Sequence, residues 1–216
     1  MNAGQDTTKT TRILLVRHGL NEWVQTGRLA GRRAGVSLNP EGVRQASLLA
    51  DRLSSWPIAA VYSSPLERAR ETAAPIAAAG RLTVQTASAL TEVNYGDWTG
   101  REIKELVETT EWRLLQVRPS AVRFPHGESL REVQHRAVEQ VEQLAQLLAG
   151  SWVVLVSHAD VIKAITSHYL GMHLDHYQRL VVSPASLSIL AVTPAGVVLD
   201  CFNDTAHLRT GPDIHG

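Results

Sequence analysis

The chain has 216 residues, with 21 Lys and Arg balanced by 21 Asp and Glu, and 44% of it is hydrophobic, which is the composition of an ordinary globular protein. A formal net charge of zero argues against nucleic acid or an anionic membrane surface as a partner, and the sequence shows neither an apolar run of roughly 20 residues nor the apolar core of a secretory signal. The single cysteine, Cys201, excludes an intramolecular disulfide and a cysteine-rich zinc site. We therefore expect a cytoplasmic protein whose fold is stabilised by its hydrophobic core.

The first part of the chain predicts two strands, each followed by a helix. Residues 13–16 form a short apolar run that is typical of a strand buried on both faces, and Asn39-Pro40 then predicts a helix start, with an N-cap followed by proline. Residues 58–62 predict the second strand. Behind that strand, residues 64–67 (Ser-Pro-Leu-Glu) predict a capping box, and the helix that it opens ends at Gly80.

The middle of the chain is less regular. A short apolar run at residues 82–84 leads into a loop, and residues 101–124 are helical at first and are then interrupted by proline. This second pattern predicts an insertion over one end of the sheet, where insertions often shape a substrate site. Ser129 and Glu132 then form another capping box, which opens a long amphipathic helix that we expect to end at Gly150.

The last part of the chain predicts one more strand and helix and then a closing hairpin. Residues 152–156 form another apolar run, and a helix follows from about residue 159 to 170. Residues 187–192 and 197–202 flank a turn and predict a β-hairpin.

Strands that alternate with helices indicate an α/β fold. We expect a three-layer sandwich, in which a mostly parallel mixed sheet is flanked by helices on both faces. No linker or internal repeat divides the chain. We therefore predict a single domain over residues 12–207, with loose tails at residues 1–11 and 208–216.

Polar side chains follow three of the predicted strands, at the point where each strand ends. Arg17 and His18 follow the first strand, Arg68 comes shortly after the second, and His158 follows the strand at residues 152–156. Because ligands of such sheets bind beyond the carboxyl ends of the strands, we expect these side chains to lie close together. The helix start behind His158 adds backbone N–H groups, and the forked donors of arginine suit a tetrahedral phosphate. The sequence therefore predicts an anion site.

A histidine in this cluster can do more than bind an anion. Neutral imidazole is a nucleophile near pH 7, so it can accept a phosphoryl group and form a covalent intermediate. Glu92, in a loop that can reach the same edge, is a candidate proton donor for the leaving oxygen. A single histidine after a strand is more often structural, and a loop glutamate is usually exposed. The catalytic interpretation depends on the coincidence of all these residues at one edge.

Beyond the residue chemistry, the sequence resembles a known family. Leu15-Val16-Arg17-His18-Gly19 resembles the signature of the histidine phosphatase superfamily, which includes the cofactor-dependent phosphoglycerate mutases. Val24 and Ala30 depart from the pattern, because polar residues are usual at these positions. Six further blocks resemble the family in family order, and the resemblance covers roughly residues 12–207: residues 27–31, 38–46, 63–72, 92–100, 127–129 and 156–158.

The resemblance implies a role for each residue of the cluster. His18 would be the phosphorylated nucleophile, and Arg17, Arg68 and His158 would hold the phosphoryl group. Glu92 would be the general acid and base. The resemblance also implies a phosphoglycerate mutase-like fold and chemistry without a metal. We expect five further residues to bind substrate: Asn21, Arg28, Gly31, Tyr95 and Ala159.

Three functions stay open at this point. The first is a phosphomonoesterase without a cofactor that acts on small phosphorylated metabolites, because residues 95–106 resemble small phosphatases of broad specificity or of the α-ribazole-phosphate type. The second is a phosphomutase, which would use 2,3-bisphosphoglycerate. The third is a phosphate-binding protein with little turnover. We expect no nucleic-acid or membrane partner, and a homodimer is one alternative for the oligomeric state. For the mutase, five basic residues of the insertion are candidates to hold the bisphosphate: Arg101, Lys104, Arg113, Arg118 and Arg123.

Other chemistries lack their motifs. The sequence has no Gly-x-x-x-x-Gly-Lys phosphate loop, no Gly-x-Ser-x-Gly elbow and no His-Glu-x-x-His zinc helix. A cysteine phosphatase would need an arginine six residues after Cys201, where His207 stands. His173 and His176 have a spacing that two metal ligands can share on a helix, but we favour a surface helix without a metal.

Overall fold

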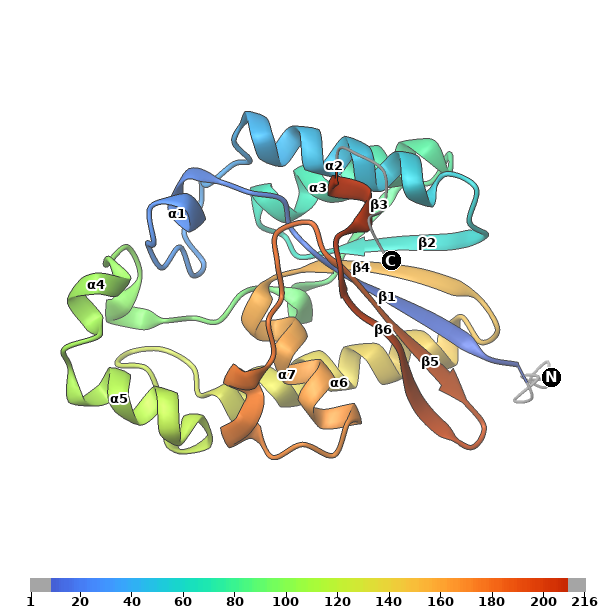
Figure 1. Ribbon diagram of the computed structural model, residues 1–216. Coiled ribbons are helices and arrows are strands. Elements are labelled where there is room, and N and C mark those ends of the chain that lie inside the picture. Colours follow the sequence, from blue (N-terminus) through green and yellow to red (C-terminus); the bar gives the residue numbers. More distant parts are fainter. Residues whose placement is uncertain (1–8, 210–216) are drawn as a thin grey trace, which may run out of the picture.

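The computed structural model describes residues 9–209, which fold around one six-stranded sheet (Figure 1). The strand order is β3-β2-β4-β1-β5-β6. The first four strands of this order run parallel, and the hairpin β5–β6 is antiparallel, so the predicted mostly parallel mixed sheet is confirmed. The strands are β1 (Thr11–Arg17), β2 (Ile58–Ser63), β3 (Val84–Thr86), β4 (Trp152–Ser157), β5 (Leu187–Thr193) and β6 (Gly196–Asp204).

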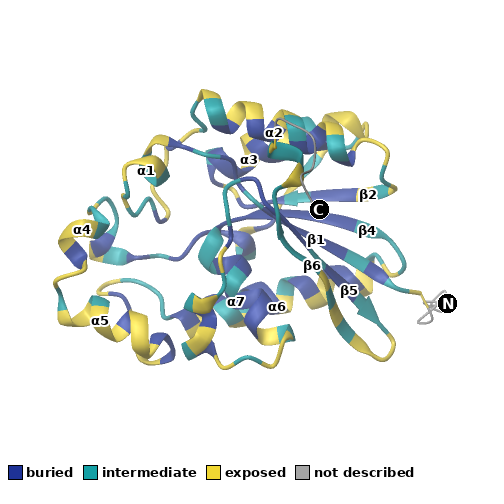
Figure 2. Cartoon of the chain, in the orientation of Figure 1, coloured by how far each residue is buried: buried dark blue, intermediate teal, exposed yellow. Residues whose placement is uncertain are grey.

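Helices cover both faces of this sheet, because the central strands are apolar on both faces. The covering helices are α2 (Pro40–Leu53), α3 (Glu67–Ala79), α6 (Leu130–Leu147) and α7 (Ala159–Tyr169). Leu14 of β1 packs in one core with α2 and α3, and its neighbour Leu15 packs in a second core with α6 and α7. Figure 1 shows these two helix layers above and below the sheet, and Figure 2 shows the strands buried between them. The predicted three-layer α/β sandwich is confirmed.

Two of the predicted helix starts are present as the sequence indicates. The Asn39 side chain caps α2, since its Oδ1 accepts a hydrogen bond from the Gly42 N–H at 2.8 Å. At α6, the Ser129 side chain accepts from the Glu132 backbone, and the Glu132 carboxylate accepts from the Ser129 backbone at 2.8 Å. Both helices therefore satisfy part of their free N-terminal N–H groups with their own side chains.

The start of α3 differs from the prediction. The capping box predicted at residues 64–67 is wrong, because α3 begins at Glu67 and no side chain caps it. The Ser64 hydroxyl instead lies 2.8 Å from Nε2 of His158, and the Glu67 carboxylate accepts from the Gly35 N–H at 3.0 Å. Tertiary partners have thus taken both side chains that a local cap would use.

Residues 101–124, which we name the cap, lie beyond the carboxyl ends of the parallel strands (Figure 1). The cap contains two short helices, α4 (Ile103–Leu106) and α5 (Thr110–Val117), whose outer sides are exposed (Figure 2). An ion pair of 3.1 Å between Arg28 and Glu102 joins the cap to the loop that follows α1 (Glu22–Gln25). The remaining described helices are single 3-10 turns or short 3-10 segments: Ser88–Leu90, Gly96–Trp98, Pro119–Ala121, Leu174–Arg179 and Ala206–Leu208.

A close backbone crossing between Gly96 and Pro125 joins the segments that come directly before and after the cap. The Asp97 N–H donates to the Pro125 carbonyl at 3.0 Å, Gly96 has a φ of +52°, and a Cβ on Gly96 would overlap that carbonyl oxygen. We expect Gly96→Ala to lower the free energy of unfolding by about 1 kcal/mol for the backbone conformation. The overlap adds about 1–3 kcal/mol. Denaturant unfolding measures the sum.

The matched control for this substitution is Gly171→Ala. Gly171 has a similar φ of +62°, but apart from its chain neighbours no residue that the structure describes has an atom within 4 Å of the position that its Cβ would take. This variant should lose only the backbone contribution. Equal losses at both positions would show that the crossing at Gly96 does not constrain the fold.

The predicted tails lie largely outside the described residues. Residues 1–8 and 210–216 are not described, β1 begins at Thr11, and the last 3-10 turn ends at Leu208. Among residues 9–209, no helix combines the length and the apolar character that crossing a membrane requires.

Candidate active site

Two buried histidines meet at the carboxyl ends of the two central strands. Strands β1 and β4 are parallel neighbours, and their register pairs Arg17 with Ser157. The next residues along each strand, His18 and His158, therefore lie side by side, with ring centroids 5.1 Å apart. They are 3% and 0% exposed, which is unusual for a residue type that is commonly at the surface.

The environment of His18 makes its ring a neutral nucleophile. Nδ1 lies 2.7 Å from the carbonyl oxygen of Gly19, and because a carbonyl can only accept, Nδ1 carries the ring hydrogen. The lone pair is then on Nε2. Burial, followed by the charges of Arg17 and Arg68, holds the pKa of His18 well below its usual value. The imidazole is therefore uncharged at neutral pH, and the lone pair of its Nε2 can attack an electrophile.

Unpaired N–H donors surround this ring. Arg68 is 1% exposed and donates from Nη2 to the Gly31 carbonyl at 2.8 Å, but its Nε and Nη1 have no partner among the described residues. Arg17 donates to the Val182 carbonyl at 2.6 Å, and its Nε likewise lacks a partner within residues 9–209. A buried donor without an acceptor is costly, so the site is built for an anion with several oxygens.

His158 supplies a further donor. Its Nε2 lies 2.8 Å from the Ser64 hydroxyl, which itself accepts from the Leu66 N–H at 3.4 Å and so has its hydrogen available for Nε2. With that hydrogen on Ser64, the ring hydrogen of His158 is on Nδ1, which has no partner among the described residues and lies 3.9 Å from a Glu92 oxygen. Burial, followed by Arg68, lowers the pKa of His158 well below its usual value.

Glu92 is a buried carboxyl that can exchange protons near neutrality. It is 8% exposed, and burial, followed by the charge of Asp160, raises its pKa to about 7, against the opposing influence of Arg68. Its backbone carbonyl accepts from Arg32 at 3.0 Å and from Arg136 at 3.3 Å. These two contacts fix the loop that carries the carboxyl. A carboxyl with this pKa can both donate and accept a proton at neutral pH.

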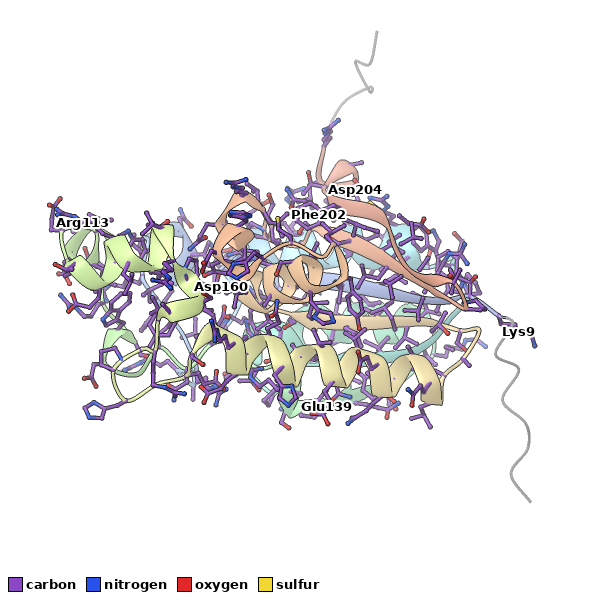
Figure 3. All side chains as sticks on the ribbon, turned by 90° about the horizontal axis from the view of Figure 1, so that it is seen from below. Lys9, Arg113, Glu139, Asp160, Phe202 and Asp204 are labelled. Atoms are coloured by element: carbon purple, nitrogen blue, oxygen red, sulfur yellow. The ribbon has the colours of Figure 1, made fainter. Side chains whose placement is uncertain are left out.

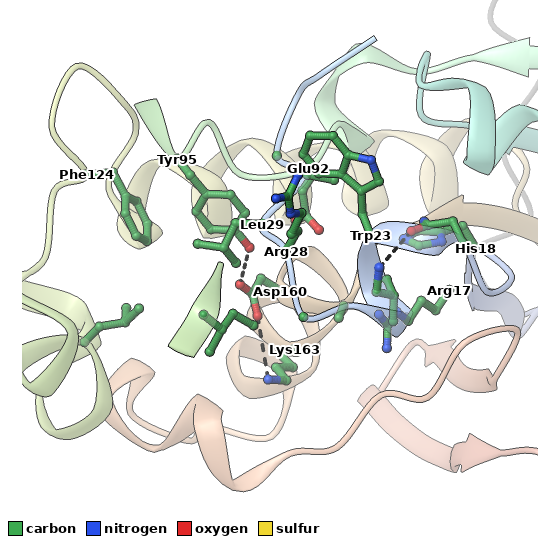
Figure 4. A pocket seen from close by; sticks show the side chains of 18 of the residues that line it. Arg17, His18, Trp23, Arg28, Leu29, Glu92, Tyr95, Phe124, Asp160 and Lys163 are labelled. Atoms are coloured by element: carbon green, nitrogen blue, oxygen red, sulfur yellow. Dashed lines mark hydrogen bonds and ion pairs between the residues drawn. The ribbon is translucent and has the colours of Figure 1, made fainter. Parts of the chain in front are cut away.

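These residues open onto one cavity of about 320 Å³. Figure 4 shows His18 and Arg17 at one end, Glu92 above the middle, and Tyr95 and Phe124 towards the other end. All the predicted site residues line the cavity except His158, whose ring is next to that of His18 at a centroid distance of 5.1 Å. Large apolar side chains of the wall come from α1, from the loop that follows it and from the cap: Trp23, Leu29, Ile103, Trp112, Leu115 and Phe124.

The residues predicted to bind substrate line this cavity, and several also hold the structure. The Asn21 side chain caps α1, since its Oδ1 accepts from the Val24 N–H at 2.9 Å, while its Nδ2 is buried without a partner in the described chain. The Gly31 carbonyl is already bound by an arginine, and Arg28 is paired with the cap. Ala159 begins α7 and so presents the helix N-terminus to the cavity.

The basic side chains of the cap do not line the cavity. Arg113 is 71% exposed and projects at the outer end of the cap (Figure 3), and Lys104 is 80% exposed and pairs with Glu102 at 2.6 Å. Arg123 pairs with Glu132 at 2.6 Å. Arg101 and Arg118 are exposed, and neither contributes to the cavity wall. The cap therefore contributes apolar contacts to the cavity, and its positive charge faces solvent.

Sequence reasoning missed four polar residues of the cavity, Gln116, Asp160, Lys163 and Gln178. Asp160 directly follows Ala159, and Lys163 lies one helical turn beyond it, so helical spacing from the predicted helix start could have found both. It also missed Arg136, because nothing local connects α6 with the loop of Glu92.

The two histidines of possible metal-ligand spacing have no third ligand among the described residues. His173 precedes the 3-10 segment Leu174–Arg179 that contains His176, and their rings are 6.4 Å apart. In the part of the chain that the structure describes, no group of three metal-ligating side chains is present.

A neutral buried histidine, unpaired cationic donors and a carboxyl with a raised pKa are groups that phosphoryl transfer can use, and here they meet on an α/β sandwich. The chain belongs to the histidine phosphatase superfamily (branch 1), whose sequence pattern matches residues 13–205. The predicted family is confirmed.

Two proteins and one crystal structure are similar to this chain over nearly its whole length. Phosphoserine phosphatase 1 of Hydrogenobacter thermophilus is 33% identical over 199 residues, which cover 91% of this chain and 94% of that protein. A probable phosphoglycerate mutase GpmB of Yersinia pestis is 34% identical over 204 residues, with the same coverage of 91% and 94%. A crystal structure of a phosphoserine phosphatase mutant of Entamoeba histolytica with phosphoserine superimposes with a TM-score of 0.85 at 26% identity, over 92% of this chain and 100% of that one. The family and these relatives support a phosphatase activity.

Proposed function

We propose that the protein is a phosphomonoesterase that acts on small phosphorylated metabolites through a phosphohistidine at His18. The observation that carries this proposal is the neutral His18 ring, with its Nε2 lone pair among unpaired donors of Arg17, Arg68 and His158. A nucleophile and the donors for a phosphoryl group thus share one end of the cavity. A protein that only binds phosphate would need neither a buried nucleophile nor a carboxyl with a pKa of about 7.

In the first half-reaction, Nε2 of His18 attacks phosphorus, and the bond between phosphorus and the ester oxygen breaks. Arg17, Arg68 and the Nδ1–H of His158 hold the equatorial oxygens, on which the negative charge of the transition state is spread. Protonated Glu92 gives its proton to the leaving alkoxide, which departs as a neutral alcohol. The products of this step are the alcohol and a phosphohistidine.

In the second half-reaction, water is the acceptor. Glu92, now a carboxylate, takes a proton from the water as its oxygen attacks phosphorus, and the bond between phosphorus and Nε2 of His18 breaks. Inorganic phosphate leaves, and both residues return to their starting protonation states. Every charge that develops is met by a side chain, so we expect turnover without a metal or other cofactor.

The phosphomutase alternative has one observation in its favour, the 34% identity to a probable phosphoglycerate mutase. A mutase must retain a bisphosphorylated intermediate and keep water out, which calls for further cations in the cavity. The basic residues of the cap point to solvent. The two further cations of the cavity wall, Arg28 and Lys163, each lie beside a carboxylate, Glu102 and Asp160 respectively. These features favour the phosphatase.

One assay tests the proposal. The purified protein is incubated in EDTA with p-nitrophenyl phosphate and, separately, with 3-phosphoglycerate plus 2,3-bisphosphoglycerate, and free phosphate and 2-phosphoglycerate are measured. We expect phosphate release from the monoester and little isomerisation. Fast isomerisation with little free phosphate would instead establish the mutase, and the absence of both would contradict an enzymatic function.

A further inference from the structure

One carboxylate in this cavity forms no bond to a reacting group in the proposed mechanism and acts there only through its charge. Asp160 lies in the first turn of α7, and its side chain is 19% exposed. Its Oδ2 accepts from the Tyr95 hydroxyl at 2.7 Å, while its Oδ1 is 3.6 Å from Nζ of Lys163 (Figure 4). That second distance is longer than a hydrogen bond. The carboxylate thus keeps acceptor positions that no described residue fills at hydrogen-bonding distance.

Lys163 is a partly buried cation that also has hydrogen-bonding capacity to spare. Its side chain is 15% exposed, its Nζ donates to Oε1 of Gln178 at 3.1 Å, and it lies 5.4 Å from the centre of the Tyr177 ring. An ammonium group has three N–H donors, and among residues 9–209 only the bond to Gln178 is of hydrogen-bonding length. Asp160 and Lys163 therefore present two opposite, incompletely satisfied charges on one wall of the cavity.

The location of the pair relates it to the leaving group. Asp160 follows Ala159, whose helix N-terminus lies at the phosphoryl end, and its charge is felt by Glu92, the proton donor to the leaving oxygen. Both residues line the same cavity as Glu92 and Ala159, so a leaving group that occupies the cavity beyond the phosphoryl end can contact this pair. Desolvated charges gain most from a partner of opposite charge, so a group with both charges fits better than a polyol.

We propose that Asp160 and Lys163 form a subsite for a zwitterionic leaving group, so that the preferred substrates are phosphate esters of hydroxy-amino acids. The ammonium group would bind Asp160, and the carboxylate would bind Lys163. This inference depends on the proposed phosphatase function and adds its substrate class. It also predicts selection against 3-phosphoglycerate, which has a hydroxyl where the ammonium would be.

Four phosphate esters test the two charges separately. O-phosphoserine has both groups, phosphoethanolamine has the ammonium alone, 3-phosphoglycerate has the carboxylate alone, and 2-hydroxyethyl phosphate has neither. A charge-assisted hydrogen bond is worth about 1.5–3 kcal/mol, so each missing group should lower kcat/KM by about tenfold or more. Asp160→Asn should reduce the ratio of O-phosphoserine to 3-phosphoglycerate by about tenfold. Lys163→Met should do the same to the ratio of O-phosphoserine to phosphoethanolamine.

Ratios within each variant are used because the charge of Asp160 also acts on Glu92 and can change every rate together. Asp200→Asn, an exposed carboxylate on β6, is the matched control and should leave both ratios unchanged. If wild type releases phosphate from p-nitrophenyl phosphate but treats the four esters alike, the subsite is wrong and the phosphatase function stands. Ratios that do not respond to either substitution would overturn the subsite as well. If p-nitrophenyl phosphate is not hydrolysed, both proposals fail.

Discussion

His18→Ala is expected to lower kcat/KM for p-nitrophenyl phosphate by about 10⁴-fold or more, because it removes the atom that forms the covalent intermediate. Steady-state assays measure the loss. Brief incubation with a labelled substrate, followed by denaturation at alkaline pH, should trap acid-labile label on wild type and none on this variant. The pocket should keep its affinity for inorganic phosphate, since Arg17 and Arg68 are unchanged.

His135→Ala is the matched control, because His135 is exposed on α6. It should retain wild-type activity and the trapped label. Substantial turnover by His18→Ala, with label still trapped elsewhere, would place the nucleophile at another residue and contradict the proposed mechanism.

Glu92→Gln is expected to lower kcat for an alkyl phosphate by about 10²–10⁴-fold, because glutamine cannot protonate the leaving alkoxide. p-Nitrophenolate leaves without a proton, so with p-nitrophenyl phosphate the first step should survive. The second step then lacks its base. Rapid mixing should therefore show a burst of about one p-nitrophenolate per site, followed by slow turnover. Glu139→Gln, an exposed glutamate on α6 (Figure 3), should behave as wild type, and a Glu92→Gln variant without the burst would exclude Glu92 as the base.

The pKa of Glu92 also predicts a pH dependence. With a pKa of about 7, Glu92 loses its proton as the pH rises through neutrality, so kcat for alkyl phosphates should fall there, and Glu92→Gln should lack this limb. Stability follows the same sign. Because the folded pKa is above the ordinary value of 4.5, the protonated carboxyl stabilises the fold at low pH, and this contribution is lost as the pH rises through about 7. A rise from about pH 5 to pH 8 should therefore lower the free energy of unfolding of wild type relative to that of Glu92→Gln, by up to roughly 3 kcal/mol. Thermal unfolding at each pH measures this difference.

The parts of the fold and site that the sequence predicts are those that the backbone alone determines. The apolar runs of β1 and β4 have no alternation because both faces are buried, and their carboxyl ends must meet at one edge of a parallel sheet. This is why Arg17, His18 and His158 could be brought together from the sequence.

The parts that the sequence did not predict depend on contacts between distant segments. Ser64 looks like a helix cap in its own sequence, but His158 from another strand binds its hydroxyl. Arg136 holds the loop of Glu92 from a helix more than forty residues away, and no periodicity signals this. The apolar wall contributed by Trp112 and Leu115 depends on how the cap folds back over the strands, which the proline-interrupted pattern did not specify.

The cap contributes no strand to the sheet and no residue to the phosphoryl-binding cluster, yet it supplies much of the wall that a leaving group would contact. Its ion pair to Arg28 and the buried side chains of Leu106, Leu115 and Phe124 attach it to the rest of the fold. Ile103 and Gln116 line the cavity from the cap but lie outside this buried core, so substitutions there can change the wall without disturbing either the strands or the nucleophile. In such a molecule the choice of substrate can diverge rapidly among descendants of one ancestor while the reaction itself is inherited unchanged.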